Sequence, residues 1–135
     1  MYNIDIYPMT HIALNIANVK QRIVSAAQSA AVDPSSILLL AVSKGRSIEE
    51  ILEVVSAGIH DIGENRVKEA KEKSRILKER LDGNVSVRMH MVGHLQTNKV
   101  KDAVRIFDFI HSVDSLELAA CIDKEAKACG KIQDV

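Results

Sequence analysis

The sequence of residues 37–65 is ILLLAVSKGRSIEEILEVVSAGIHDIGEN, and this stretch decides the fold. The apolar run Ile37–Val42 is typical of a strand buried on both faces, as in a parallel sheet. Ser47–Glu50 is a capping-box pattern that opens an amphipathic helix, and Gly58 is its predicted end. A short strand, Ile59–Ile62, follows. Strand, helix and strand in this order predict two parallel strands joined by a right-handed crossover.

The alternation continues on both sides of this stretch. Before it, apolar residues spaced three and four apart predict a helix over residues 10–30. After it, the pattern predicts a charged helix ending before Gly83, a strand over Val85–Val92 and a shorter helix through Phe107. A strand over Phe109–His111 and a helix from Ser115 to Gly130, whose inner face includes Leu116, come next. The opening of a fifth strand over Lys131–Val135 ends the pattern. Such an order indicates an α/β protein with a parallel sheet, either open or part of a barrel.

Composition excludes several classes of function. The 135 residues include 18 Lys and Arg against 18 Asp and Glu, so no net charge attracts nucleic acid or anionic lipid. No apolar run approaches the roughly 20 residues of a membrane span, and the start lacks the features of a signal peptide. We therefore expect a cytoplasmic protein with neither a nucleic acid nor a membrane as partner.

The two cysteines do not indicate a disulfide. Cys121 and Cys129 lie eight residues apart in one predicted helix, which separates them by about 12 Å. A disulfide requires a much shorter Cα–Cα distance. Both are expected to be reduced thiols, with Cys129 on the inner face of its helix.

Polar segments follow each of the four predicted strands. They are Ser43–Arg46, Gly63–Arg66, Gly93–Lys99 and His111–Ser115. In parallel α/β folds, ligand groups gather just past the carboxyl ends of the strands. The sequence therefore predicts one site built from these four segments.

Lys44 is the most specific candidate in these segments. It directly follows a hydrophobic strand, and a lysine amine that is partly buried can act as a Schiff-base nucleophile. An ordinary lysine extending to solvent at a strand end is the alternative. Gly63–Asn65 is likewise either part of the site or only a tight turn with a helix cap.

The histidines are weaker candidates. His90 and His94 are four residues apart, but Gly93 and the strand-like residues before it argue against a helical metal pair, so no metal site is expected. His60 and His111 lie on predicted strands, where packed or rim positions are common. Walker A, GxGxxG, GxSxG and HExxH motifs are absent from the sequence.

Four segments of the sequence form a specific set of motifs: Leu40–Lys44 (LAVSK), Gly63–Asn65 (GEN), His90–Lys99 (HMVGHLQTNK) and His111–Ser115 (HSVDS). Together they resemble the pyridoxal 5′-phosphate (PLP) homeostasis protein family, which is related to the N-terminal barrel of alanine racemase. Their order and spacing match the family from about Met9 to Val135.

The resemblance implies a TIM-type (β/α)8 barrel that holds PLP as a lysine aldimine, without robust catalysis, as a carrier that influences vitamin B6 and amino-acid pools. It implies that Lys44 carries the cofactor and that Asn65 lines its pocket. The residues that it implies at the pocket mouth are His90, Gly93, His94 and Ser112.

This sequence departs from the family in two respects. Gly45–Ser47 stands where Thr and a later Pro are common, and Arg66 and Lys68 replace an aromatic residue and a Gln. Family members also run past 200 residues, so the resemblance covers about the first half of a barrel, with four strands and the start of a fifth. The expected organisation is an N-terminal extension over residues 1–8 and the N-terminal half of a PLP-binding barrel over residues 9–135.

Half a barrel has physical consequences. Free sheet edges favour self-association. The resemblance implies that the phosphate-binding segments belong to the second half of the barrel, so this half is expected to bind PLP more weakly. Two other functions stay open. One is a racemase-like enzyme or Schiff-base lyase that uses Lys44, with an acid or base from His90, His94 or His111. The other is a structural half-barrel that binds no small molecule.

Overall fold

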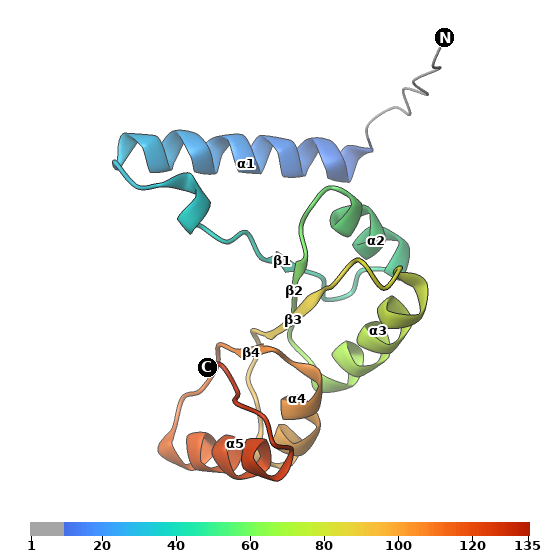
Figure 1. Cartoon of the computed structure of the whole chain (residues 1–135), viewed down its shortest axis with the longest axis vertical. Coiled ribbons are helices and arrows are strands. Elements are labelled where there is room, and N and C mark those ends of the chain that lie inside the picture. Colours follow the sequence, from blue (N-terminus) through green and yellow to red (C-terminus); the bar gives the residue numbers. More distant parts are fainter. Residues whose placement is uncertain (1–9) are drawn as a thin grey trace.

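The computed structural model describes residues 10–135 (Figure 1). Within them, helices alternate with short strands. In chain order the elements are α1 (His11–Ser29), the 3-10 turn η1 (Pro34–Ser36), β1 (Ala41–Val42), α2 (Ile48–Ser56), β2 (Asp61–Glu64), α3 (Val67–Arg80), β3 (Arg88–Met91), the 3-10 turn η2 (Thr97–Lys99), α4 (Val100–Ile106), β4 (Phe109–Ile110) and α5 (Leu116–Ala128). The proposed boundary between residues 8 and 9 lies outside the described residues.

The four strands form one parallel sheet in the order β1-β2-β3-β4. This arrangement confirms the predicted α/β fold. Asp134 bridges Phe109 in parallel, and its carbonyl accepts a 3.0 Å hydrogen bond from the Ile110 N–H. The last residues therefore lie beside β4, where the sequence predicted the opening of a fifth strand.

Local sequence signals explain the helix boundaries. Ser47 and Glu50 form the capping box predicted for α2, and the Thr10 and Ser115 hydroxyls cap α1 and α5. Gly58 follows α2 with φ +79°, a left-handed conformation that favours glycine. The predicted ends of α2 are therefore confirmed.

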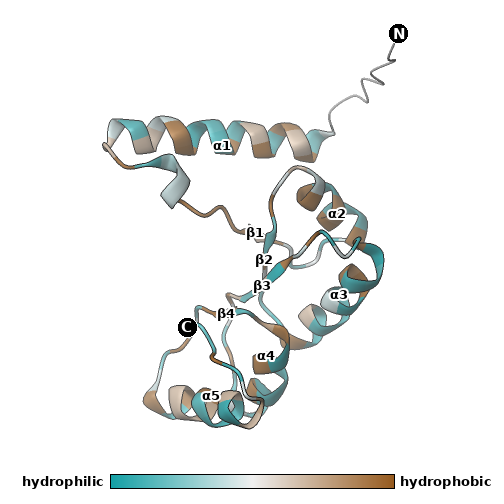
Figure 2. Cartoon of the chain, in the orientation of Figure 1, coloured by the Kyte–Doolittle hydropathy of each residue, from teal (hydrophilic) through white to brown (hydrophobic). Residues whose placement is uncertain are grey.

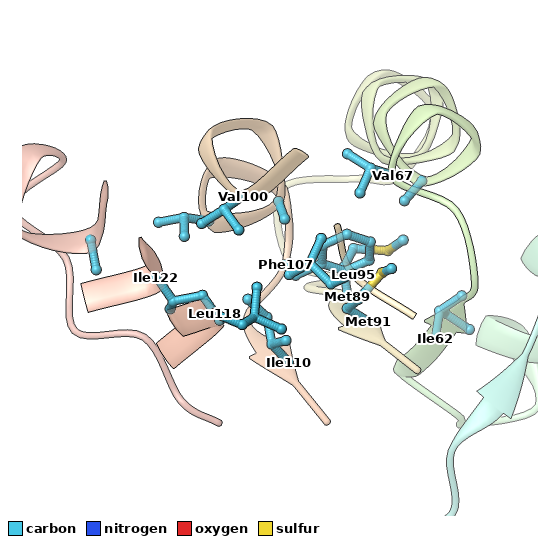
Figure 3. Close-up of a cluster of buried hydrophobic side chains, with 14 of the residues drawn as sticks. Ile62, Val67, Met89, Met91, Leu95, Val100, Phe107, Ile110, Leu118 and Ile122 are labelled. Carbon is cyan, nitrogen blue, oxygen red and sulfur yellow. The ribbon is translucent and has the colours of Figure 1, made fainter. Parts of the chain in front are cut away.

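One face of the sheet packs against the helices and forms the hydrophobic core. Neighbouring helices contact one another along this side in the order α1 to α5. Figure 3 shows side chains from the strands meeting side chains from α3, α4 and α5. Phe107 and Ile110 are fully buried in this cluster. We call this side the outer face, because the helices cover it.

We call the opposite side of the sheet the inner face. It carries every second residue of each strand, including Val42, Gly63, His90 and Phe109, which are paired across the four strands. The helices α2 to α5 lie on the other side of the sheet (Figure 1). Val42 is consequently 49% exposed. The inner face is therefore open to solvent near β1.

The segment leading into β1 differs from its prediction. It is hydrophobic along most of its length (Figure 2), yet Leu38 is 56% exposed. Only Ala41 and Val42 pair with β2. The prediction of a strand buried on both faces over Ile37–Val42 is wrong, because the helices cover only one face.

Two other strands have different bounds from those predicted. β2 is Asp61–Glu64 rather than Ile59–Ile62, because Asp61 pairs in register with Arg88 of β3. β3 is shorter than the predicted Val85–Val92 strand. Gly63 and Glu64 thus belong to a strand, so the alternative of a turn and helix cap at Gly63–Asn65 is wrong.

Two predictions about α5 are wrong. Leu116 is 91% exposed, and Leu118 occupies the inward position in its place, one helical turn before Ile122. Cys129 follows the helix and is exposed instead of filling its inner face. Cys121 and Cys129 are both free thiols, as expected. Among residues 10–135, every helix is too short or too polar to cross a lipid bilayer.

Candidate functional site

The four polar segments predicted from the sequence lie at one edge of the sheet. Each lies at or just past the carboxyl end of a strand, with Gly63 and Glu64 still inside β2, and the strands are parallel neighbours. The structure therefore places the four segments side by side, as the sequence predicted. In parallel sheets this is the edge at which ligand groups gather.

Lys44 follows β1 at this edge. Val42 lies on the inner face beside Gly63, whereas the Ser43 hydroxyl donates a hydrogen bond to Glu64 on the outer side. Lys44 is the next residue, in the turn past the carboxyl end of β1. Lys44 is exposed, and within residues 10–135 its ammonium has neither a hydrogen-bond nor an ion-pair partner. Its amine is therefore accessible for reaction.

A buried ion cluster lies directly beneath Lys44. The ammonium of Lys73, on α3, donates to the Ser43 carbonyl at 2.6 Å, to Glu64 at 2.6 Å and to Glu69 at 2.7 Å. The same Glu69 oxygen accepts the Gly45 N–H at 2.9 Å. The main chain on both sides of the candidate nucleophile is therefore tied to α3.

Two carboxyl groups, those of Glu64 and Glu69, share the single ammonium of Lys73. Burial lowers the pKa of Lys73, but its hydrogen bonds to Glu64 and Glu69 outweigh that effect and raise the pKa above its ordinary value. Hydrogen bonds from Lys73 and then from the Gly45 N–H lower the pKa of Glu69. Lys73 and Glu69 are therefore both charged at neutral pH.

Gly93 and Asn65 are in close contact at the same edge. A Cβ on Gly93 would lie 2.4 Å from the Asn65 carbonyl oxygen and 2.7 Å from its Cα. No side chain fits at this position without moving the backbone of Asn65. Gly93 therefore allows two of the candidate segments to approach each other.

A chain of polar side chains crosses the inner face. Asp61 accepts hydrogen bonds from Arg88 at 2.8 Å and from His90 Nε2 at 2.8 Å. Burial raises the pKa of Asp61, but the bonds from Arg88 and His90 outweigh burial and hold the pKa below its usual range. Asp61 is thus an anion that orients His90, whose side chain is almost fully buried.

His90 extends this chain to His111. Its Nδ1 lies 2.9 Å from His111 Nε2, and its ring stacks on Phe109 with centroids 4.6 Å apart. His90 therefore bonds Asp61 through one ring nitrogen and His111 through the other. His111 is exposed, so the bonded chain ends at a histidine that solvent can reach.

Two further candidates from the sequence lie at the same edge. The Ser112 hydroxyl is buried and has no hydrogen-bond partner among the described residues. His94 is 70% exposed at its side chain and lies 3.5 Å from Asp114. Residues 10–135 contain no group of three or more His, Cys, Asp or Glu that could hold a metal ion.

Sequence reasoning missed the residues that support the candidates. Lys73 lies on the buried stripe of α3, three residues after Ala70 and four before Leu77. This helical spacing could have predicted that Lys73 is buried. Asp61 and Arg88 are charged residues within strands, and their pairing depends on a register that the sequence does not show.

No family model matches the sequence, but individual proteins and solved structures do. The pyridoxal phosphate homeostasis protein of Pseudomonas aeruginosa is 38% identical to the chain over 120 residues, which are 89% of this chain and 50% of that protein. The protein of the same name from Escherichia coli K12 is 36% identical over 120 residues, with the same two coverages.

Solved structures show the same relationship. PipY of Synechococcus elongatus without PLP matches with a TM-score of 0.76 and 36% identity, over 91% of this chain and 51% of that chain. PipY with PLP bound gives 0.72 and 37%, over 89% and 50%. The chain therefore belongs to the pyridoxal phosphate homeostasis protein family and spans about half the length of these relatives, with four parallel strands of their TIM-type barrel.

Proposed function

We propose that this chain carries the lysine-bearing part of a PLP site, with Lys44 as the residue that binds the cofactor covalently. The observation that carries this proposal is the position of Lys44, which is exposed at the carboxyl end of β1, beside the other strand ends, in a turn held by Glu69 and Lys73. PipY, about half of whose chain matches this protein, has been solved with PLP bound. PLP supplies an aldehyde that condenses with a lysine amine.

The residues at this edge fit such a group. The Lys44 amine, in its neutral form, would attack an aldehyde carbon, and the aldehyde oxygen would leave as water. Ser112 offers a buried hydroxyl with no partner in the described part of the chain. A buried polar group of this kind is stabilised by a polar ligand.

The other candidates have supporting roles in the proposal. Gly93 keeps the backbone of Asn65 at the edge, so that the Asn65 amide lines the pocket. His90 is buried and acts through its hydrogen bond to His111, whereas His94 is exposed at the rim. We assign the chain to the N-terminal half of the barrel, with PLP binding weaker than that of a complete barrel, and a role as carrier in vitamin B6 homeostasis.

The test is the intact mass of the chain after addition of PLP and reduction by borohydride. We expect one adduct, which peptide mapping places on Lys44 and which Lys44→Ala abolishes. Lys124→Ala, at an exposed lysine on α5, is the matched control and retains the adduct. Equal labelling of many surface lysines would contradict the proposal.

A second candidate function rests on the chain from Asp61 through His90 to His111. An ordered histidine at the same edge as Lys44 supplies the acid or base that a racemase-like enzyme or Schiff-base lyase needs. Turnover of an amino acid or aldol substrate, lost in both Lys44→Ala and His111→Gln, would support it. Adduct formation on Lys44 without turnover supports the carrier instead.

We also propose that two copies associate. Among residues 10–135, β1 has a strand neighbour on one side only. Val42 in β1, and Ile37 and Leu38 before it, are all more than 40% exposed. Burying such apolar surface against a second copy is favourable. Analytical ultracentrifugation should show a concentration-dependent dimer, and a monomer at every concentration would contradict this.

A further inference from the structure

The main chain around Lys44 forms a tight turn. The Ser43 carbonyl accepts the Arg46 N–H at 3.0 Å, and Gly45 at the third position has φ +68°. A positive φ at this position is characteristic of a type II turn and favours glycine. Lys44 therefore occupies one of the two corners of the turn, where its side chain direction depends on how the turn is held.

Two anchors hold this turn, and both come from one pair of residues on α3. Lys73 donates to the Ser43 carbonyl at 2.6 Å, and Glu69 accepts the Gly45 N–H at 2.9 Å. Lys73 and Glu69 are themselves joined at 2.7 Å. The anchors thus form a closed set of contacts, here called the Lys73 clamp, around the residue before Lys44 and the residue after it.

The burial of Lys73 is costly for a role in packing alone. Its side chain is 9% exposed, whereas Lys68, Lys71 and Lys78 on the same helix are all exposed. An ammonium has three N–H donors, and Lys73 uses them on Ser43, Glu64 and Glu69. A hydrophobic residue often replaces a buried ion pair without loss of stability, so the ion pair is better explained by the geometry that it fixes.

We propose that Lys73, together with Glu69, is a positioning residue that holds the turn so that the Lys44 amine projects onto the inner face of the sheet. The inference rests on the proposed function of Lys44 for its biological meaning. The clamp itself can be tested without any cofactor.

The first measurement is hydrogen exchange of the Gly45 amide in the absence of PLP. Glu69→Ala removes its acceptor, and we expect exchange to become about tenfold faster, the factor that corresponds to one lost hydrogen bond. Glu69→Gln retains an acceptor oxygen and should restore much of the protection. Because the Glu69 side chain is 30% exposed, neither change disturbs a fully buried position.

Lys73→Met tests the other anchor, and Lys71→Met is the matched control. Lys71 lies two residues earlier on α3, with its side chain 64% exposed and directed to Asp102. We expect Lys73→Met to accelerate Gly45 exchange and to change the rate at which trace acetic anhydride labels Lys44, whereas Lys71→Met leaves both unchanged. Lysines on α5 serve as internal standards for the labelling.

The final measurement is the rate of the PLP adduct on Lys44 after borohydride reduction. Slower formation in Lys73→Met and Glu69→Ala, with recovery in Glu69→Gln, supports the clamp. Unchanged Gly45 exchange and Lys44 labelling in Lys73→Met and Glu69→Ala would overturn it. A wild-type chain that forms no adduct on Lys44 would instead refute the proposed function, while the exchange data still decide the clamp.

Discussion

The two faces of the sheet carry different kinds of side chain. The outer face is covered by hydrophobic side chains such as Ile62 and Phe107, both completely buried. The inner face carries Asp61, Arg88 and His90 beside the half-exposed Val42. The hydrophobic core thus lies on the outer face, whereas the inner face carries a bonded polar chain, so substitutions on each face should have different consequences.

The largest effect is expected from the outer face. Phe107→Ala removes a ring from the middle of the core in Figure 3 and should lower the free energy of unfolding by about 3–5 kcal/mol. Val42→Ala on the inner face removes a half-exposed side chain and should cost roughly 1 kcal/mol or less. Urea denaturation followed by circular dichroism measures both, and equal losses would contradict the division between the faces.

Gly93 tests the edge at which the faces meet. Gly93→Ala forces its Cβ against the Asn65 backbone, and overpacking of this kind should cost about 1–3 kcal/mol. Gly83→Ala is the control, because a Cβ added there would meet nothing within 4 Å among residues 10–135 beyond its chain neighbours. The same urea titration applies. Equal stability of the two variants would mean that Asn65 moves freely, and its assignment to the pocket would then lose support.

The stability that the Asp61 carboxylate contributes to the inner face should depend on pH. Asp61→Asn replaces a charged acceptor of two hydrogen bonds and should cost about 1.5–3 kcal/mol at neutral pH. Because the folded pKa of Asp61 is lowered, this stabilisation is present above the unfolded value of 3.8 and is lost as the pH falls through the folded pKa.

The measurement for Asp61 is the difference in unfolding free energy between wild type and Asp61→Asn as the pH falls. We expect the difference to shrink on acidification below the unfolded pKa. Asp102→Asn, at a side chain 48% exposed, should show little difference at any pH. A gap that stays constant into strong acid would show that the carboxylate charge contributes nothing to the inner face.

The order of the elements and the edge that carries the candidate site could be predicted from the sequence, because local signals determine them. The Ser47 capping box, the helical stripes and the polar segments after each strand predicted the order of elements and the edge that carries the candidate site. These features depend on neighbours within a few residues. The positions of Lys44, Asn65, Gly93 and Ser112 at that edge were predictable for this reason.

The inner face was less predictable, because it depends on contacts between distant residues. The pairing of Asp61 with Arg88 requires the register of β2 and β3, and the exposure of Leu38 depends on which face the helices cover. The burial of Lys73 could have been predicted from the sequence, since this residue interrupts the apolar stripe of α3. A charged residue at an inward helical position requires a buried partner, but the sequence does not say which carboxylate supplies it.

The smallest effect is expected where charges belong to neither face. Arg75 and Glu79 pair at 2.8 Å on the solvent side of α3, with side chains 62% and 60% exposed. Arg75→Ala should cost only about 0.3–0.5 kcal/mol, because water and salt screen an exposed pair. Added sodium chloride should remove even that difference in urea denaturation. A cost as large as that of Asp61→Asn would mean that ion pairs stabilise this chain wherever they lie, and the inner face would then have no special electrostatic role.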